Sequence, residues 1–317
     1  MSVRMTHLER TKINAARLSI GVGVSLVITK AVIGLLTHSV SIKGEAVHSA
    51  TDVVASLVAF VAIRKATVPA DDDHPYGHGK IESLSGLAEA VIIGAAAIAI
   101  AVEATRSLLG AEPNVHVGVL GIGIMIASAS ANFAVATHLS SVARKSDSPA
   151  LAADAKHLMV DVWTSMGVLA GLVATKLTGY NRIDAIIGFA VSLMVLNAAW
   201  HIGRGAVDFL LDGRLPDDEI VRIEHIFNVD ERVLGFHKLR TRKSGADRHV
   251  DVHIQVDDDL SLRAAHQITE ELEDEIRKVL PNTEVVIHTE PFYEEQIHQM
   301  EIEHRRGREG GIGKSKQ

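Results

Sequence analysis

The sequence predicts an α-helical membrane protein with six transmembrane helices, followed by a C-terminal cytoplasmic α+β domain. Hydrophobic residues make up 47% of the 317 residues but aromatic residues only 4%. Apolar content made mostly of Ala, Val, Ile and Leu is typical of helices that pack in lipid. After about Asp208 the long apolar segments stop and charged, alternating segments begin. The chain is therefore expected to have a membrane domain (1–207) and a soluble domain (208–296).

Six segments approach the length of about 20 residues that a helix needs to span a bilayer. They are roughly Leu18–Leu36, Val40–Ile63, Leu84–Val102, Val115–Leu139, Leu158–Leu177 and Ile183–Ile202. Each segment contains small residues, such as Gly23 and Gly167. Small side chains let helix backbones approach closely, which favours a packed bundle.

Several of these segments also carry charged or titratable residues. They are Lys43, Glu45, His48 and Asp52 in the second, Glu89 in the third and Asp161 in the fifth. A charge inside a membrane is costly, so we expect these side chains to face the bundle interior or a water-filled cavity.

Positively charged residues predict the orientation of the spans. They are concentrated before the first span, between the second and third, and between the fourth and fifth: Arg4, Arg10, Lys12, Arg17, Arg64, Lys65, Lys80, Arg144, Lys145 and Lys156. The opposite loops hold fewer. By the positive-inside rule, both termini are expected in the cytoplasm.

The soluble part reads as two helices and three strands. The expected elements are a helix from Pro216 to about Phe227, strands Val233–Arg240 and His249–Val256, a helix over Leu262–Leu280, and a strand over Glu284–His288. The second strand alternates apolar and polar residues, the pattern of a half-buried strand. The polar, Gly-rich tail at 297–317 is expected to be disordered.

The pattern His-x-x-x-Asp occurs twice in the membrane part. His48 and Asp52 lie in the second span, and His157 and Asp161 in the fifth. Spacing of i,i+4 places both side chains of a pair on one helix face. If the two faces meet, they supply two imidazoles and two carboxylates, a tetrahedral set suited to Zn²⁺. The alternative is that these residues only hydrogen-bond helices together.

Two further groups of potential metal ligands lie outside the spans. Asp71, His74 and His78 fall in the loop after the second span and could form a small site open to the cytoplasm, or a solvated acidic turn. In the soluble domain the candidates are His237, His253, His266, His288 and Glu290. These could converge at one edge of the domain, although any single one could be an ordinary surface histidine.

The chain resembles the cation diffusion facilitator family from Arg10 to about Phe292. The paired His-x-x-x-Asp motifs, the segment Asp71–Glu82 (DDDHPYGHGKIE) and the segment Leu239–Gly245 (LRTRKSG) carry the resemblance. It implies six transmembrane helices, a ferredoxin-like or metallochaperone-like cytoplasmic domain, a homodimer, and metal export in exchange for protons.

The resemblance also assigns roles to individual residues. It makes His48, Asp52, His157 and Asp161 the transport site, Asp71, His74 and His78 a loop site, and His237, His253, His266, His288 and Glu290 a dimer-interface site. Lys80 and Asp212 stand where some members form a charge interlock. Glu290 stands where other members often have Asp.

The expected function is a zinc/proton antiporter in a prokaryotic inner membrane. Zinc is expected as cargo and as a structural or regulatory ion in the cytoplasmic domain. Iron, manganese, cadmium and cobalt are alternative cargoes, and a membrane metal sensor or a membrane zinc hydrolase are alternative functions. A four-ligand set argues against a hydrolase, because catalytic zinc keeps an open position.

Composition and motifs exclude several other ligand types and energy sources. The chain has no Cys, so any zinc is held by imidazole and carboxylate. A net charge of -7 argues against nucleic acid as the main partner. The sequence also lacks the Gly-x-x-x-x-Gly-Lys-Ser/Thr phosphate loop, so ATP is not the expected driving force.

Overall fold

The computed structural model describes residues 7–36, 40–109, 119–178 and 182–293. The chain divides into two compact units, Met1–Leu211 and Asp212–Gln317. The division falls four residues after the sequence-based boundary at residue 207. The predicted disordered tail at 297–317, and residues 115–118 of the predicted fourth span, lie outside the described residues.

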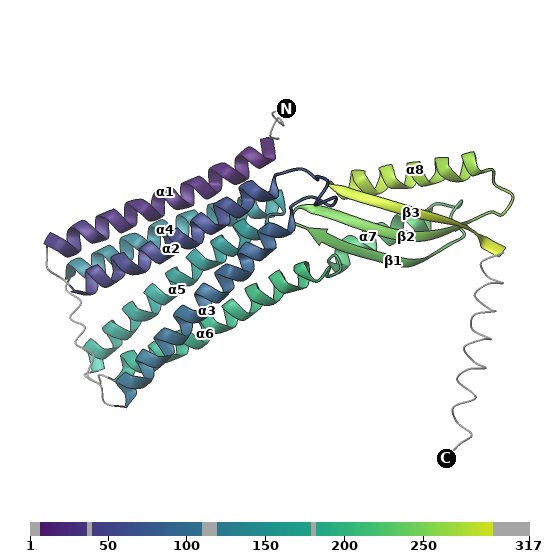
Figure 1. The fold of residues 1–317 in the computed structure, drawn as a ribbon. Coiled ribbons are helices and arrows are strands. Elements are labelled where there is room, and N and C mark those ends of the chain that lie inside the picture. The colour runs from purple at the N-terminus through teal and green to yellow at the C-terminus, as the bar shows by residue number, and fades with distance from the viewer. Residues whose placement is uncertain (1–6, 37–39, 110–118, 179–181, 294–317) are drawn as a thin grey trace, which may run out of the picture. The chain divides into compact units, whose positions relative to one another are not determined.

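The first unit is helical throughout its described secondary structure (Figure 1). Its six helices are α1 (His7–Leu36), α2 (Val40–Ala66), α3 (Lys80–Leu108), α4 (Val119–Ser146), α5 (Pro149–Thr178) and α6 (Arg182–Leu210). Each helix is longer than the apolar segment that predicts it. The extra turns carry polar residues, because a helix continues past the hydrocarbon layer into the polar interface.

Hydropathy of the described residues supports membrane spans in this unit. Four helices contain stretches long and apolar enough to cross a membrane by composition: His7–Leu36, Lys80–Leu108, Ile122–Ser146 and Ala185–Leu210. The other two, α2 and α5, are the helices that carry the His-x-x-x-Asp pairs.

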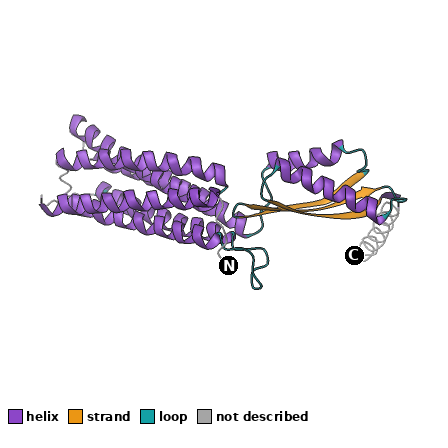
Figure 2. Cartoon of the chain, turned by 90° about the horizontal axis from the view of Figure 1, so that it is seen from above, coloured by secondary structure: helices purple, strands orange, loops and turns teal. Residues whose placement is uncertain are grey.

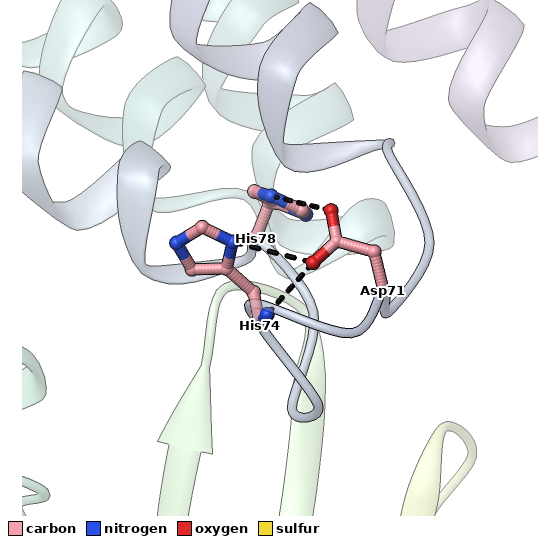
Figure 3. A group of neighbouring side chains, drawn as sticks. All are labelled: Asp71, His74 and His78. Atoms are coloured by element: carbon pink, nitrogen blue, oxygen red, sulfur yellow. Dashed lines mark hydrogen bonds and ion pairs between the residues drawn. The ribbon is translucent and has the colours of Figure 1, made fainter.

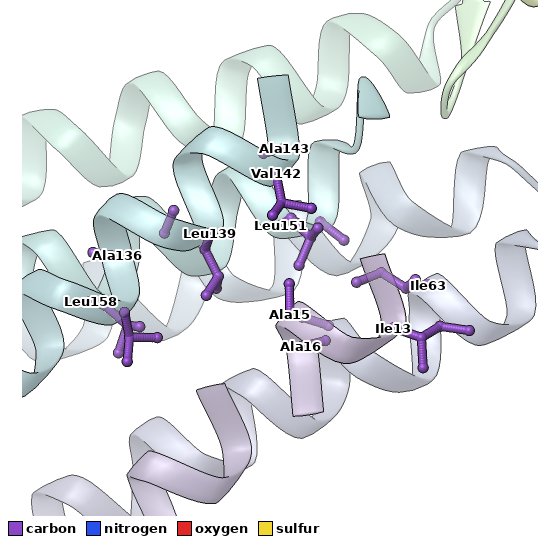
Figure 4. Packing of buried hydrophobic residues seen from close by; sticks show 14 residues of the cluster. Ile13, Ala15, Ala16, Ile63, Ala136, Leu139, Val142, Ala143, Leu151 and Leu158 are labelled. Atoms are coloured by element: carbon purple, nitrogen blue, oxygen red, sulfur yellow. The ribbon is translucent and has the colours of Figure 1, made fainter. Parts of the chain in front are cut away.

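Small and branched side chains form the core of the helical unit. One buried cluster joins α1, α2, α4 and α5, with Leu139, Leu151 and Ile63 fully buried (Figure 4). Close helix contacts depend on glycine. A Cβ atom at Gly23 would lie 2.8 Å from Val53 Cγ2, and one at Gly167 would lie 2.5 Å from Val191 Cγ2. These glycines therefore set the α1–α2 and α5–α6 separations, as the sequence indicated.

The second unit is a three-stranded sheet with two helices on one face (Figure 2). Its elements are α7 (Asp217–Val229), β1 (Gly235–Ser244), β2 (Asp247–Val256), α8 (Leu262–Val279) and β3 (Thr283–Pro291). The strand order is β1-β2-β3, with β1 antiparallel and β3 parallel to β2. The helix α8 makes the crossover that a parallel pair requires.

Local sequence explains these elements. Three acidic residues open α7, where they favour the positive end of the helix dipole. The side chain of Ser261 caps α8 by accepting from the Ala264 N–H at 3.2 Å. In β2 the apolar alternate residues are buried in the core, as predicted. One irregularity interrupts β1 between His237 and Arg240, where Lys238 has φ of 52°.

Candidate functional site

The helices α2 and α5 bring the two His-x-x-x-Asp pairs together. Each imidazole faces the carboxylate of the other helix. The distance from His157 Nε2 to Asp52 Oδ1 is 3.4 Å, and the distance from His48 Nε2 to Asp161 Oδ1 is 3.8 Å. A further 4.0 Å separates His157 Nε2 from Asp161 Oδ2. The ligand atoms of His48, Asp52 and Asp161 all lie within 4.8 Å of one another, and His157 lies beside both carboxylates.

These distances suit a four-coordinate metal. A tetrahedral zinc ion with bonds of about 2.1 Å holds neighbouring ligand atoms about 3.4 Å apart. The observed separations of 3.4 to 4.0 Å differ from this value by a few tenths of an ångström. The donor set of two nitrogens and two oxygens is one that zinc accepts.

The site lies inside the bundle. Asp52, Asp161 and His157 are buried, while the side chain of His48 is 46% exposed. Within the described residues, both ring nitrogens of His157 and Oδ2 of Asp161 are buried without a hydrogen-bond partner. Buried polar atoms usually find a partner, so these atoms need one that the chain does not supply. A bound cation would satisfy one ring nitrogen of His157 and Oδ2 of Asp161.

A second cluster occupies the loop between α2 and α3 (Figure 3). Asp71 Oδ1 lies 3.3 Å from His74 Nδ1, and Asp71 Oδ2 lies 3.5 Å from His78 Nε2. The turn that gathers them is built by hydrogen bonds from the His74 and Asp73 N–H groups to Asp71. It also requires Gly77, whose φ of +74° is a conformation that L side chains rarely adopt.

Hydrogen bonds orient the side chains of this loop cluster and favour the ionised form of Asp71, as cation binding requires. The backbone N–H of His74 donates to Asp71 and, with the nearby imidazoles, holds the pKa of that carboxyl below its usual value. The Nδ1 atom of His78 lies 3.3 Å from the Val68 carbonyl oxygen. A proton on Nδ1 would leave Nε2, which faces Asp71, free to bind a metal. Three protein ligands and an exposed position can take up and release an ion.

The third cluster lies at the ends of strands in the soluble unit. Glu290 on β3 connects the histidines: its Oε1 lies 2.5 Å from His253 Nδ1 and 3.7 Å from His288 Nε2, and its Oε2 lies 3.1 Å from His237 Nε2. Neighbouring strands position these residues, because His253 on β2 is in register with His237 on β1 and His288 on β3.

Electrostatics favour an ionised Glu290. Burial acts to raise the pKa of Glu290, but the hydrogen bond from His253 and the nearby charge of His237 outweigh burial. The pKa of this carboxyl is therefore lower than its ordinary value of 4.5. His266, the remaining predicted member, is exposed on α8 and pairs with Glu270 at 3.4 Å. The sequence could not predict that His266 lies apart from the other histidines, because the position of a residue on a helix does not indicate which strand its side chain approaches.

Lys80 and Asp212, the two residues of the predicted charge interlock, each contact a different group. Lys80 begins α3 and its Nζ donates to the Leu210 carbonyl oxygen at 3.3 Å. Asp212 Oδ1 lies 4.0 Å from Arg242 Nη1. A direct contact between Lys80 and Asp212 remains a prediction.

Two buried polar features were not singled out from the sequence. Lys12 Nζ donates to Glu82 Oε1 at 2.7 Å, which ties α1 to α3. Asp154 on α5 is fully buried and accepts from Ser56 Oγ at 2.9 Å. The signal for Asp154 was its position one helical turn before His157. It was missed because the apolar segment that predicted the fifth span begins only at about Leu158.

Both units of the chain match models of known protein families. Residues 16–211 match the cation efflux transmembrane domain, and residues 215–292 match the cytoplasmic domain of cation efflux proteins. The cation-efflux pump FieF of Salmonella arizonae is 34% identical over 277 residues, covering 87% of this chain and 92% of the relative. FieF of Cronobacter sakazakii is 35% identical over 255 residues, covering 80% and 84%.

Two solved structures are similar to part of this chain. A structure of CzrB is 32% identical and covers 24% of this chain and 96% of that chain, with a TM-score of 0.24. The metal-bound C-terminal domain of the CzcD transporter from Thermotoga maritima is 29% identical and covers 23% and 87%, with a TM-score of 0.23.

Proposed function

Because the chain belongs to the cation efflux family, also called cation diffusion facilitators, we propose that it exports zinc from the cytoplasm in exchange for protons. The chain is an integral membrane transporter with a cytoplasmic C-terminal domain, and it is not an enzyme. Zinc as the cargo and protons as the counter-ion are the proposal.

One observation carries this proposal: α2 and α5 bring two imidazoles and two carboxylates together, and three of these four side chains are buried. Asp52 and Asp161 are each 8% exposed, and His157 is 4% exposed. Ionisable residues inside a membrane bundle are costly and mark ion pathways. A metal sensor would not need ligands at this depth, which favours transport over sensing.

The same four residues explain the exchange of zinc for protons. A metal ligand must give up its proton before it binds zinc, so zinc and protons compete for the site. Zinc loads from the cytoplasm and releases protons there. When the helices rock and open the site to the other face, protons displace zinc. No covalent bond is broken in this cycle.

The donor set supports zinc as the cargo. Zinc is commonly bound by four His and carboxylate ligands in a tetrahedron, and the site offers that number. Manganese favours more oxygen ligands, whereas iron, cobalt and cadmium accept similar donors with other geometries. These metals are the alternative cargoes, and a competition assay among them measures the selectivity of transport.

The soluble unit and the loop have supporting roles in this proposal. In the soluble unit, a zinc ion binds to the cluster formed by His237, His253, His288 and Glu290. This bound zinc stabilises a homodimer. His266 joins the site at the interface with the partner subunit. The cluster of Asp71, His74 and His78 captures zinc at the cytoplasmic side. Both termini face the cytoplasm of a prokaryotic inner membrane.

Zinc flux into sealed proteoliposomes with a pH-sensitive dye in the lumen tests the transport proposal. Wild type should move zinc inward while protons leave the lumen. Asp161→Asn should abolish both movements, because it removes a ligand charge. Asp208→Asn on α6, whose side chain is 63% exposed, is the matched control and should transport normally.

Two results would contradict the proposal. Normal flux in the Asp161→Asn variant would exclude this transport site. Zinc movement that continues unchanged after the proton gradient is collapsed would indicate a passive uniporter. Competition by iron, manganese, cadmium or cobalt in the same vesicles identifies the preferred cargo.

A further inference from the structure

A buried ion pair and a hydroxyl group join three helices at one end of the membrane unit. Lys12 Nζ on α1 lies 2.7 Å from Glu82 Oε1 on α3, and the two side chains are 7% and 1% exposed. Glu82 Oε2 accepts a hydrogen bond from the hydroxyl of Ser148, which directly precedes α5. Ser148 Oγ also accepts from the Leu151 N–H at 3.4 Å, which fixes the hydroxyl to the first turn of α5. One carboxylate therefore connects α1, α3 and α5.

This group lies at the cytoplasmic end of the helices. The α6 helix ends at Leu210, directly before the cytoplasmic domain. Lys80 begins α3, and its Nζ donates to the Leu210 carbonyl oxygen, so α3 begins at the same end. Glu82 is only two residues further along α3. Its partners Lys12 and Ser148 are therefore also at the cytoplasmic ends of their helices.

The transport site lies deeper in the bundle. On α5, His157 follows Ser148 by nine residues, about 13.5 Å along the helix axis. Buried apolar side chains fill the cytoplasmic halves of α1, α2 and α5, among them Ile13, Ile63 and Leu151 (Figure 4). The ion pair and this apolar cluster close the cytoplasmic end of the bundle in this structure.

An ion pair is not the most stable way to fill a contact that stays closed. Burying Lys12 and Glu82 removes both charges from water, and apolar side chains of similar volume are often equally stable or more stable in such a position. An ion pair suits a contact that opens and closes. Both charges regain hydration when they separate, whereas separated apolar side chains would expose their surface to water at a cost in free energy.

We propose that Lys12, Glu82 and Ser148 form a cytoplasmic latch, which is closed in this structure and separates when the transport site opens to the cytoplasm. Opening breaks one ion pair and one hydrogen bond, and water then hydrates the three side chains. The latch thereby sets the balance between the closed and the open conformation. This inference rests on the proposed function, because a latch has a role only if the transport site is exposed alternately to the two sides of the membrane.

The alternative is a structural brace that never opens. Removing one partner of the ion pair destabilises the protein whether the contact is a brace or a latch, so stability alone does not distinguish them. Access to the transport site does, because only a latch controls how often reagents from the cytoplasm reach the interior of the bundle.

A thiol reporter measures this access, because the chain has no Cys of its own. Ser19 on α1 is 4% exposed and follows Lys12 by seven residues, which places it deeper than the latch. It lines a cavity of about 10 Å³ that Asp52 also lines. In inside-out membrane vesicles that contain the full-length Ser19→Cys protein, a membrane-impermeant thiol reagent approaches from the cytoplasmic side. The labelling rate in the absence of zinc reports how often the latch opens.

Adding Lys12→Met to the reporter removes the cation of the latch and keeps a long side chain. Glu82 is then buried without its partner in the closed conformation, whereas water hydrates it in the open one. We expect labelling to become at least about tenfold faster. Lys145→Met is the matched control: this lysine is exposed in the last turn of α4, and the variant should label at the reporter's rate.

The double variant Lys12→Met/Glu82→Met tests the latch in the opposite direction. Two apolar side chains now fill the contact, and such replacements are often neutral or stabilising, so the protein is expected to fold. Opening would expose these side chains to water, which favours the closed conformation. We expect labelling and zinc flux to be at least about threefold slower than in the reporter. A brace that never opens predicts no change in either rate.

The outcomes separate this inference from the proposed transport. Equal labelling of the reporter, the Lys12→Met variant and the double variant would overturn the latch while leaving zinc transport intact. Faster labelling of both variants would also overturn it, because loosened packing would then explain the access. If Lys12→Met does not fold, the double variant decides alone: unchanged labelling and flux would refute the latch. Absence of zinc flux in wild type would instead contradict the proposed function.

Discussion

Replacing Asp52 by Asn tests the transport site most directly. The change keeps the side-chain shape but removes one of the two negative charges that balance Zn²⁺. Asp52 is 8% exposed and its Oδ1 lies 3.4 Å from His157 Nε2, so water cannot replace the lost charge. Removing one partner of a buried charge pair costs about 3–5 kcal/mol. We therefore expect zinc to bind this site about 10²- to 10⁴-fold more weakly.

Equilibrium dialysis of the purified full-length chain with radioactive zinc measures this effect. The Asp52→Asn variant should lose one tight site per chain, and the exposed control Asp208→Asn should keep it. Circular dichroism checks that both variants retain their helices. If Asp52→Asn keeps every tight site with affinity within about threefold of wild type, the assignment of Asp52 as a ligand is refuted.

Three further predictions concern the cytoplasmic side. Residues 212–293, which form a unit with its own core, should bind zinc when expressed alone, gain thermal stability and shift toward a dimer; no thermal shift at saturating zinc would contradict this. In that metal-free domain, Glu290→Gln should lower the free energy of unfolding by about 1.5–3 kcal/mol at pH 7. Because the pKa of Glu290 is lowered on folding, its stabilising contribution is present above pH 4.5 and disappears as the pH falls through the folded-state pKa. Urea unfolding should therefore show a difference between the two proteins that vanishes in acid, and a difference independent of pH would be inconsistent with the ionised carboxylate. Finally, Asp71→Asn should weaken the apparent zinc affinity of transport about tenfold without changing the maximal rate, and an unchanged zinc dependence of flux would remove the loop from the loading pathway.

The sequence by itself determined those features that depend on local spacing. Six helices follow from long apolar segments, and the buried face of β2 follows from its alternation. The pairing of His48 with Asp52, and of His157 with Asp161, on single helix faces follows from 3.6 residues per turn. Because the chain has no Cys, any zinc must be held by imidazole and carboxylate.

Only the tertiary structure decided which of these faces meet. Contact between α2 and α5 turns two separate pairs into one cluster, with each imidazole opposite the carboxylate of the other helix. In the soluble unit, strand register gathers His237, His253 and Glu290. The sequence has no local signal for such contacts, because they join residues far apart in the chain.

Buried charge illustrates the same limit. Glu82 and Glu89 are both buried on one helix, and sequence alone does not distinguish them. In the fold, Lys12 from α1 forms an ion pair with Glu82, whereas neither side-chain oxygen of Glu89 has a hydrogen-bond partner within the described residues. The protonation of a buried carboxyl group depends on the charges around it, and those charges come from other helices, so only packing decides it.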